Sequence, residues 1–212
     1  MSITSEITDP GFQSGKINSE EFIRASVYHV LSRGFSSPLE MDRGHLEVLE
    51  DLLPYLQDEL ESAAITLLDE WKAALKDEEK LTLAYTRLFL GPFIVQCPAY
   101  ASIYLEPDQK LMGEVSAYVA DKYATAGLGP GEGPREAPDH ITLEWEFMYY
   151  LTYRYIESGE AIWSEKRSAF YNDHMLKWLP AFSKRFEEAD SIGFYRAVFQ
   201  FMSVVIREIR VV

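Results

Sequence analysis

Residues 136–156 read EAPDHITLEWEFMYYLTYRYI, and the second part of this stretch decides the fold. From Ile141 to Ile156, apolar and aromatic side chains occupy nearly every side of a helix, so no face is left for water. A helix of this kind belongs in the centre of a folded domain. The acidic and imidazole side chains just before it are therefore expected at a junction between a loop and a buried helix.

The N-terminal half also shows helical spacing of apolar residues and no hairpin signal. Capped starts predict helices over about 19–35 and 38–53, and a third helix continues past a break at Pro54 to about residue 75. Asp77 is expected to open a fourth helix, which ends at Gly91. The apolar face of this fourth helix comprises Leu81, Ala84, Tyr85, Leu88 and Phe89.

The rest of the chain completes an all-α prediction. Residues 93–106 lack sustained periodicity, so a long aromatic-rich loop is expected there. A fifth helix is expected after Pro107, and the last one over about 192–210. The inner face of the fifth helix is expected to comprise Leu111, Val115, Tyr118 and Val119. We therefore predict a single-domain helical bundle of about eight to ten helices.

Glycine and proline place the boundaries of this domain. Residues 1–17 are polar and are expected to form a flexible tail before an all-helical domain at 18–212. The loop at 127–138 holds four glycines and three prolines, so a hinge is expected there. Two sub-lobes, 18–126 and 139–212, could meet at this hinge.

The bulk composition restricts the class of protein. Apolar residues make up 47% of the 212-residue chain, which is enough for a substantial core. A net charge of −14 argues against nucleic-acid binding, since phosphate attraction needs clustered Lys and Arg. No apolar run approaches the roughly 18 residues of a membrane helix, so neither stable membrane insertion nor a secretory signal is expected. The single cysteine, Cys97, fits a reducing compartment and a cytoplasmic location.

Acidic residues are concentrated between Glu40 and Glu79. Here 13 acidic residues stand against 3 basic ones, which gives this segment a net charge of −10. Such a segment can be a solvated surface or a field that attracts a basic partner. A helical adaptor that docks another protein through this acidic face is therefore one alternative function.

A second alternative is a small metal-dependent enzyme. His140 and Glu144 are four residues apart and would share a helix face, with Glu136 and Asp139 close by. Helical metal sites usually take ligands from two or more helices, and no second Glu-x-x-His motif is present, so we expect neither metal nor cofactor. Asp139 also has a simpler interpretation, because it could cap a backbone N–H near Leu143. A capping role and a binding role for Asp139 both stay open.

The sequence lacks the usual signs of covalent or phosphate chemistry. No Gly-x-Ser-x-Gly elbow is present, and Cys97 has no histidine near it in sequence. Residues 127–131 are rich in glycine but lack the preceding strand and the Lys-Ser/Thr ending of a phosphate loop. The sequence therefore gives no support to nucleophilic catalysis or to a phosphate-binding loop.

Loop aromatics indicate peptide binding instead. Phe93 and Tyr100 lie on either side of Pro98 in the predicted loop, where aromatic side chains can line a groove. An apolar groove in acidic surroundings is complementary to a peptide that is first basic and then apolar.

Three separated segments resemble the TorD/DmsD/NarJ-type redox enzyme maturation chaperones. Residues 136–148 are similar to the family's acidic-Pro-Asp-His motif with its following apolar helix, which contains a glutamate. Residues 85–92 and 98–104 resemble its Tyr-x-x-Leu-Phe-x-Gly-Pro stretch and the proline-aromatic turn after it. A His-x-x-x-Trp-x-x-x-Phe segment is matched from His174 to Phe182.

The resemblance implies an all-helical cytoplasmic chaperone without catalytic activity. It implies binding to the leader peptide or the body of a molybdopterin-containing oxidoreductase catalytic subunit, which is held until cofactor insertion and often before twin-arginine export. It also implies either a monomer or a domain-swapped homodimer. The residues that would form or support the peptide-binding region are Tyr85, Leu88, Phe89, Phe93, Pro98, Tyr100, Pro138, Asp139, His140 and Glu144.

Overall fold

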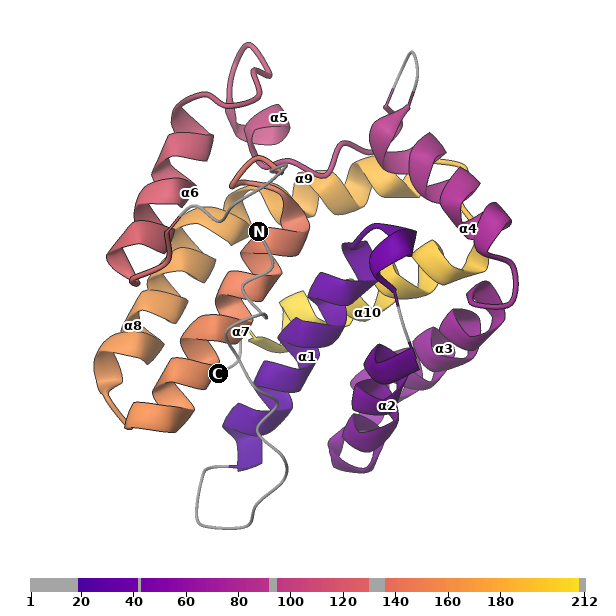
Figure 1. Cartoon of the computed structure of the whole chain (residues 1–212), viewed down its shortest axis with the longest axis horizontal. Helices are drawn as coiled ribbons and strands as arrows, with labels where there is room; N and C mark the ends of the chain where they lie inside the picture. Colours follow the sequence, from indigo (N-terminus) through magenta and orange to yellow (C-terminus); the bar gives the residue numbers. More distant parts are fainter. Residues whose placement is uncertain (1–18, 42, 92–94, 130–135, 210–212) are drawn as a thin grey trace. The chain divides into compact units, whose positions relative to one another are not determined.

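The computed structural model describes residues 19–41, 43–91, 95–129 and 136–209 (Figure 1). In chain order its α-helices are α1 (Ser19–Phe35), α2 (Arg43–Leu52), α3 (Asp58–Ala74), α4 (Glu78–Tyr85), α5 (Ser102–Leu105), α6 (Glu114–Thr125), α7 (Ile141–Ser158), α8 (Ala161–Phe170), α9 (Leu176–Glu187) and α10 (Gly193–Ile209). Shorter 3-10 or π-helical turns are η2 (Pro38–Glu40), η3 (Leu53–Tyr55), η4 (Thr86–Leu90) and η5 (Tyr171–Met175). The predicted all-α bundle is confirmed.

Several helices lie where their apolar spacing predicts them. α1 spans the predicted range, α3 ends at Ala74, and α10 begins one residue after the predicted start. The second predicted helix is shorter than expected, because residues from Pro38 form the turn η2 and regular helix begins only at Arg43. α7 ends where Gly159 takes a left-handed conformation with φ of 70°, which glycine adopts at little cost.

The fifth predicted helix was expected directly after Pro107, but it begins only with α6 at Glu114. The sequence pattern did not predict the turn between these two residues. Gln109 and Met112 in this turn have φ of 51° and 60°, which an α-helix does not allow. Of the residues expected on the inner face of this helix, the structure buries Val119 but exposes Leu111 and Tyr118. The prediction for Leu111 and Tyr118 is therefore wrong. The loop expected just upstream also contains a short helix, α5.

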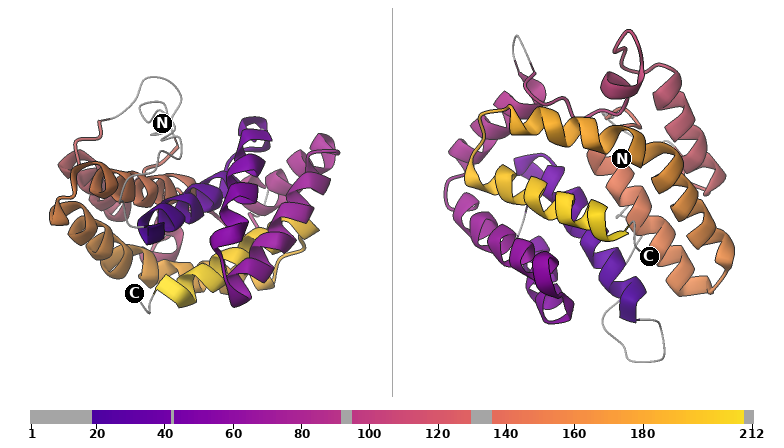
Figure 2. Two further views of the ribbon diagram at one scale, coloured as in Figure 1. Left: turned by 90° about the horizontal axis from the view of Figure 1, so that it is seen from below. Right: turned by 180° about the vertical axis from the view of Figure 1, so that it is seen from behind.

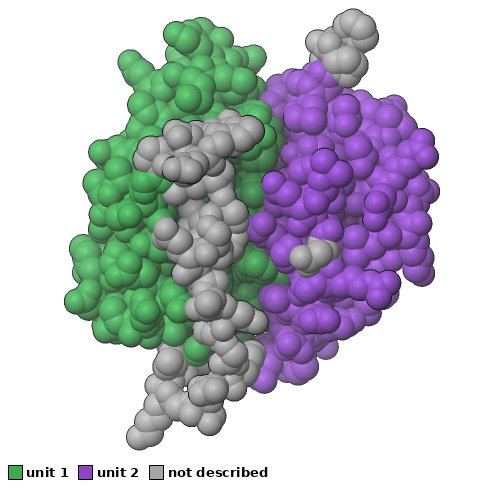
Figure 3. All heavy atoms as spheres, in the orientation of Figure 1, with its two compact units in different colours: residues 1–32, 99–180 green, residues 33–98, 181–212 purple. Residues whose placement is uncertain are grey.

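The chain forms two compact units. Unit 1 comprises residues 1–32 and 99–180, and unit 2 comprises residues 33–98 and 181–212, as coloured in Figure 3. The chain therefore passes between the units three times, within α1, before Ala99 and within α9. These units do not coincide with the sub-lobes 18–126 and 139–212 that the hinge loop suggested.

Unit 1 is built around α7, which is buried along most of its length, as its composition predicts. The Trp145 ring of α7 stacks on the Tyr28 ring of α1 with 5.6 Å between centroids. On another side, Phe147 meets Phe170 of α8 edge to face at 4.9 Å. α7 and α8 run side by side, as both views of Figure 2 show. Aromatic pairs of this kind are worth about 0.5–1.5 kcal/mol each beyond the area that they bury.

Unit 2 is held by the packing of α10 against α3. Trp71 of α3 meets Phe194 of α10 edge to face, with 5.5 Å between ring centroids. Near the end of α1, a Cβ at Gly34 would stand 3.0 Å from a methyl group of Val198, so a larger residue would force the α10 side chain to move. The close approach of the end of α1 to α10 therefore depends on the glycine at position 34.

Some sequence predictions fall outside the described residues. These are the tail at 1–17, Phe93 and residues 130–135 of the expected hinge loop. Among the helices that are described, none combines the length and apolar character needed to cross a lipid bilayer.

Candidate functional site

The structure divides the predicted peptide-binding residues between the two units. Unit 2 contains Tyr85, Leu88, Phe89 and Pro98. Unit 1 contains Tyr100, Pro138, Asp139, His140 and Glu144. The residues of each unit form a local structure of their own, described separately below.

The residues in unit 2 belong mainly to its core. Tyr85, Leu88 and Phe89 are buried, and the Tyr85 and Phe89 rings lie 5.2 Å apart. The Cys97 N–H donates to the Leu88 carbonyl at 2.8 Å, so the segment that leads to Pro98 is fixed against the turn η4, which follows α4. These side chains therefore support the segment rather than offering an open aromatic surface.

In unit 1, Tyr100 and His140 form an isolated antiparallel bridge. The Ala101 N–H donates to the Asp139 carbonyl at 2.9 Å, and the Ile141 N–H donates to the Ala99 carbonyl at the same distance. The Tyr100 and His140 rings also meet edge to face, with 4.9 Å between centroids. The segment before α5 is therefore joined to the segment that opens α7, although the two are about forty residues apart in sequence.

Asp139 lies at the centre of this junction, and its side chain has no exposed surface. One carboxylate oxygen accepts from the Ser102 N–H at 2.8 Å, and the other accepts from the Ser116 hydroxyl at 2.5 Å. Asp139 thus ties the starts of α5 and α6 to the start of α7. The capping interpretation is wrong, because the N-cap of α7 is His140, whose Nδ1 accepts from the Thr142 N–H at 3.4 Å.

Glu144, one turn into α7, is also fully buried. Its oxygens accept from His174 Nε2 at 2.6 Å and from Trp178 Nε1 at 3.0 Å. Burial raises the pKa of the Glu144 carboxyl, and the His174 ring opposes that rise. Each carboxylate oxygen therefore has a donor, and the side chain has no surface exposed to solvent.

Sequence reasoning missed this cluster of Glu144, His174 and Trp178. His174 and Trp178 are four residues apart, which places both on one side of a helix. Their spacing matches a segment of the chaperone family, but it does not indicate that either side chain contacts Glu144. His174 lies in the π-helical turn η5 rather than in regular helix. The available signal was that an acidic residue inside an apolar helix requires polar partners from elsewhere in the chain.

The pKa of His140 differs from the value near 6.5 of a histidine exposed to water. Burial lowers the pKa of His140 to about 4, although the nearby carboxylates of Glu136 and Asp139 act to raise it. The ring is therefore neutral at pH 7. Weak pH dependence of binding at near-neutral pH should not arise from His140.

The four candidate metal ligands do not converge on one point. Asp139 binds two serines, Glu144 binds His174 and Trp178, and Glu136 accepts the Tyr100 hydroxyl at 2.7 Å. Across the described ranges, no group of three or more His, Cys, Asp and Glu side chains has a geometry that could hold a metal ion. The metal-dependent alternative loses its proposed ligand set.

Glu136 is the exposed carboxylate of this region. Its side chain is open to solvent, and Tyr100, which donates to it, is only partly buried. Sequence reasoning considered Glu136 as a metal ligand but did not include it among the peptide-binding residues. The structure thus separates a surface carboxylate at Glu136 from a buried structural carboxylate at Asp139.

Comparison with known proteins gives a consistent result. The profile of the family described as nitrate reductase delta subunit matches residues 40–184. The chain is 28% identical to "Chaperone protein TorD" of Vibrio vulnificus over 191 residues, covering 84% of this chain and 89% of that protein. It is 26% identical to the TorD chaperone of Aliivibrio salmonicida over 201 residues, covering 88% and 93%.

The fold also resembles a solved structure. A redox enzyme maturation protein from Archaeoglobus fulgidus superimposes with a TM-score of 0.56 and 24% sequence identity. The match covers 93% of this chain and 99% of that one. This likeness supports the all-α fold.

Proposed function

The chain belongs to the nitrate reductase delta subunit family of NarJ/TorD-type redox enzyme maturation chaperones, and from this premise we propose that it binds a molybdoenzyme precursor. The client is a molybdopterin-containing oxidoreductase catalytic subunit, recognised through its twin-arginine leader peptide, its body or both. Binding takes place in the cytoplasm and keeps the client unexported until cofactor insertion is complete.

The observation that carries this proposal is the exposed Glu136 carboxylate beside Tyr100. A guanidinium group can donate two parallel N–H bonds to a carboxylate, and such bonds are stronger than those between neutral groups. The Tyr100 hydroxyl occupies one Glu136 oxygen and helps to orient the group. We assign Glu136 as the partner for an arginine of the leader.

Asp139 and His140 act as positioning residues in this proposal. Their backbone pairs with residues 99–101, which places Tyr100 where its hydroxyl reaches Glu136. The buried Asp139 carboxylate holds the two neighbouring helix starts through Ser102 and Ser116. Replacing either residue would therefore weaken binding through a displaced Tyr100 and Glu136.

The proposed action is binding without catalysis. The relatives are named as chaperones, which supports this assignment. The buried pair of Glu144 and His174 could suggest acid–base chemistry, but both side chains are closed to solvent. A general acid or base must come within hydrogen-bond reach of its substrate, so this pair is structural.

The acidic segment 40–79 would speed the encounter with a basic leader, because long-range attraction raises association rates. Burial of the leader's apolar region would then contribute about 25 cal/mol per Å² before ordering costs are subtracted. Specificity would come from the placed carboxylate rather than from total charge.

Calorimetric titration with a panel of synthetic twin-arginine leaders tests the proposal. We expect saturable 1:1 binding to at least one leader, and weaker binding when its two arginines are replaced by glutamine. A protein that binds none of the leaders and none of the corresponding mature subunits would not be such a chaperone.

A further inference from the structure

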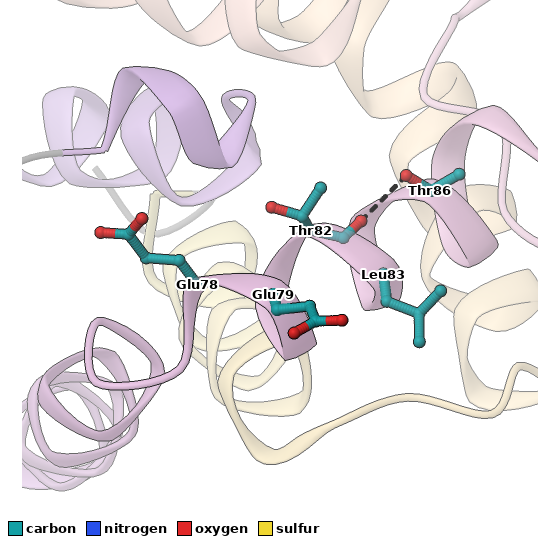
Figure 4. A pocket seen from close by; sticks show the side chains of 5 residues that line it. All are labelled: Glu78, Glu79, Thr82, Leu83 and Thr86. Carbon is teal, nitrogen blue, oxygen red and sulfur yellow. Dashed lines mark hydrogen bonds between the residues drawn. The ribbon is translucent and has the colours of Figure 1, made fainter.

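The outer side of α4 in unit 2 contains an open depression of about 490 Å³. Its lining comes from α4 and the turn η4 that continues it: Glu78, Glu79, Thr82, Leu83 and Thr86. Figure 4 shows Glu79 and Leu83 on one side of α4, with Glu78 and Thr82 on the other. The depression lies on a helix whose opposite face, including Leu81 and Ala84, is buried in the core of unit 2.

The lining of the depression includes one exposed apolar side chain, that of Leu83. Leu83 is 59% exposed. Its neighbours in sequence are the exposed polar residue Thr82 and the buried residue Ala84. Leu39 of η2, a turn that packs against α4, is 91% exposed. The Thr86 hydroxyl donates to the Thr82 carbonyl at 2.9 Å, so it satisfies its own hydrogen bond within the helix. The exposed Leu83 side chain in the lining of the depression is an apolar group that a partner can cover.

The charge of the depression is acidic. Within the described part of the chain, neither Glu78 nor Glu79 forms an ion pair, and both side chains are exposed. The only basic residue of the following turn, Arg87, faces Asp190 at 3.6 Å. The same unit also contains the acidic segment 40–79, with its net charge of −10 from 13 acidic and 3 basic residues. A partner must therefore bring positive charge together with an apolar side chain.

We propose that this face of α4 docks a basic amphipathic helix from a partner protein. Glu79 and Leu83 are four residues apart on one side of α4, so a carboxylate and an apolar anchor follow each other at helical spacing. A partner helix with Lys or Arg and Leu at the same spacing matches both groups at once. The negative charge opposes nucleic acid and anionic lipid, which share its sign.

This face belongs to unit 2, whereas the proposed arginine partner Glu136 belongs to unit 1, and the two share no residue. Docking at α4 therefore does not depend on leader binding at Glu136. It gives unit 2 a docking surface for a second segment, so that one chaperone could engage two parts of a client or two different proteins. Two weak contacts joined in one complex bind far more tightly than either alone.

A synthetic probe tests this docking on the full-length protein. The probe is a capped, fluorescein-labelled peptide of about 15 residues, or roughly four helical turns, with leucines on one face and lysines on the other. Fluorescence anisotropy should show binding with Kd on the order of 10 µM, since a single helix buries little area. Glu78→Lys/Glu79→Lys should weaken binding by about tenfold at low salt, and Leu83→Ala by about fivefold.

The matched control is Glu47→Lys/Asp51→Lys on α2, which makes the same change in net charge at two exposed positions. This control should retain binding within about twofold, since its charges are not part of the docking face. Equal losses in both charge variants would mean general attraction and would overturn the proposal. So would binding that neither Glu78→Lys/Glu79→Lys nor Leu83→Ala changes.

Two further measurements distinguish helix docking at α4 from leader binding at Glu136 and from self-association. A twin-arginine leader should bind Leu83→Ala as tightly as the unaltered protein, because Leu83 lies outside both the acidic segment 40–79 and the site at Glu136, so failure of either proposal can be told from failure of the other. Sedimentation measures whether a second copy covers the face. If the protein self-associates and Leu83→Ala makes it monomeric, the occupant is another copy and the proposal is wrong.

Discussion

The Ser116 hydroxyl donates to a carboxylate oxygen of Asp139 at 2.5 Å, in a site with no exposed surface for the aspartate. The second oxygen of the same carboxylate accepts from the Ser102 backbone N–H. Three helix starts thus share one buried charge. The sequence predicts that Asp139 contacts a peptide, whereas in the structure Asp139 is a buried side chain that holds the starts of α5 and α6 next to the start of α7.

Asp139→Ala should therefore lower stability strongly. The change leaves the Ser116 hydroxyl and the Ser102 N–H without an acceptor, and each unpaired buried group costs about 1–3 kcal/mol. We expect the free energy of unfolding in urea, followed by circular dichroism, to fall by about 3 kcal/mol. Ser116→Ala, which removes one donor, should cost about 1 kcal/mol. Strict additivity of Asp139→Asn and Ser116→Ala in a double-mutant cycle would mean that these groups do not interact.

The buried cluster of Glu144, His174 and Trp178 predicts an asymmetry between its members. His174→Phe leaves the Glu144 carboxylate in a dry site with one remaining donor, which should cost about 3 kcal/mol. Glu144→Gln removes the charge but keeps the volume, and should cost about 1 kcal/mol. Urea denaturation compares the two variants. A larger loss for Glu144→Gln than for His174→Phe would contradict this asymmetry.

Glu144→Gln should also leave leader affinity unchanged, because Glu144 is sealed away from the surface. This expectation departs from the sequence prediction, which places Glu144 among the peptide-binding residues. Calorimetric titration with a leader that binds the unaltered protein checks it. A loss of more than about tenfold, or 1.4 kcal/mol, would restore a direct role for Glu144.

Local pattern was enough to predict most of the fold, and physical reasons explain what it missed. The helix from Ile141 is apolar on nearly every side, so its position and burial follow from composition alone. The partners of Asp139 come from residues 102 and 116, far from it in sequence, and no spacing rule connects them. The late start of α6 depends on the positive φ of Met112, which its residue type disfavours.

Stability should fall as the pH drops below about 6.5, in part because of His140. Its pKa is about 4 in the folded protein and near 6.5 when unfolded, so the unfolded state binds the proton more readily. The contribution is fully present above the unfolded value and is lost as pH falls from 6.5 toward 4, by up to about 3 kcal/mol. His140→Gln should flatten the pH dependence of the unfolding free energy in this window. Identical pH profiles for the two proteins would show that His140 does not cause it.

Glu136→Gln should weaken leader binding without changing the fold. The substitution keeps the size of the side chain and its bond to the Tyr100 hydroxyl, but it removes the charge that attracts a guanidinium group. We expect about a tenfold rise in Kd, which is typical for one charge-assisted contact, and a weaker dependence of Kd on salt. Tyr100→Phe should weaken binding less, about threefold, because it frees Glu136 from its orienting donor without removing the charge.

The matched control for this prediction is Glu165→Gln, an exposed carboxylate on α8 of the same unit. It makes the same change in net charge at a position that the proposed site does not include. If Glu165→Gln and Glu136→Gln raise Kd equally, the leader is attracted by the total charge of the protein and not by a placed carboxylate. The alternative result is that Glu136→Gln raises Kd and Glu165→Gln does not. If a leader with its arginines replaced by glutamine then binds Glu136→Gln and the unaltered protein equally well, Glu136 and an arginine of the leader form an ion pair. That double-mutant comparison is the direct measure of contact between Glu136 and the leader, since changes that act elsewhere would remain visible with the altered peptide.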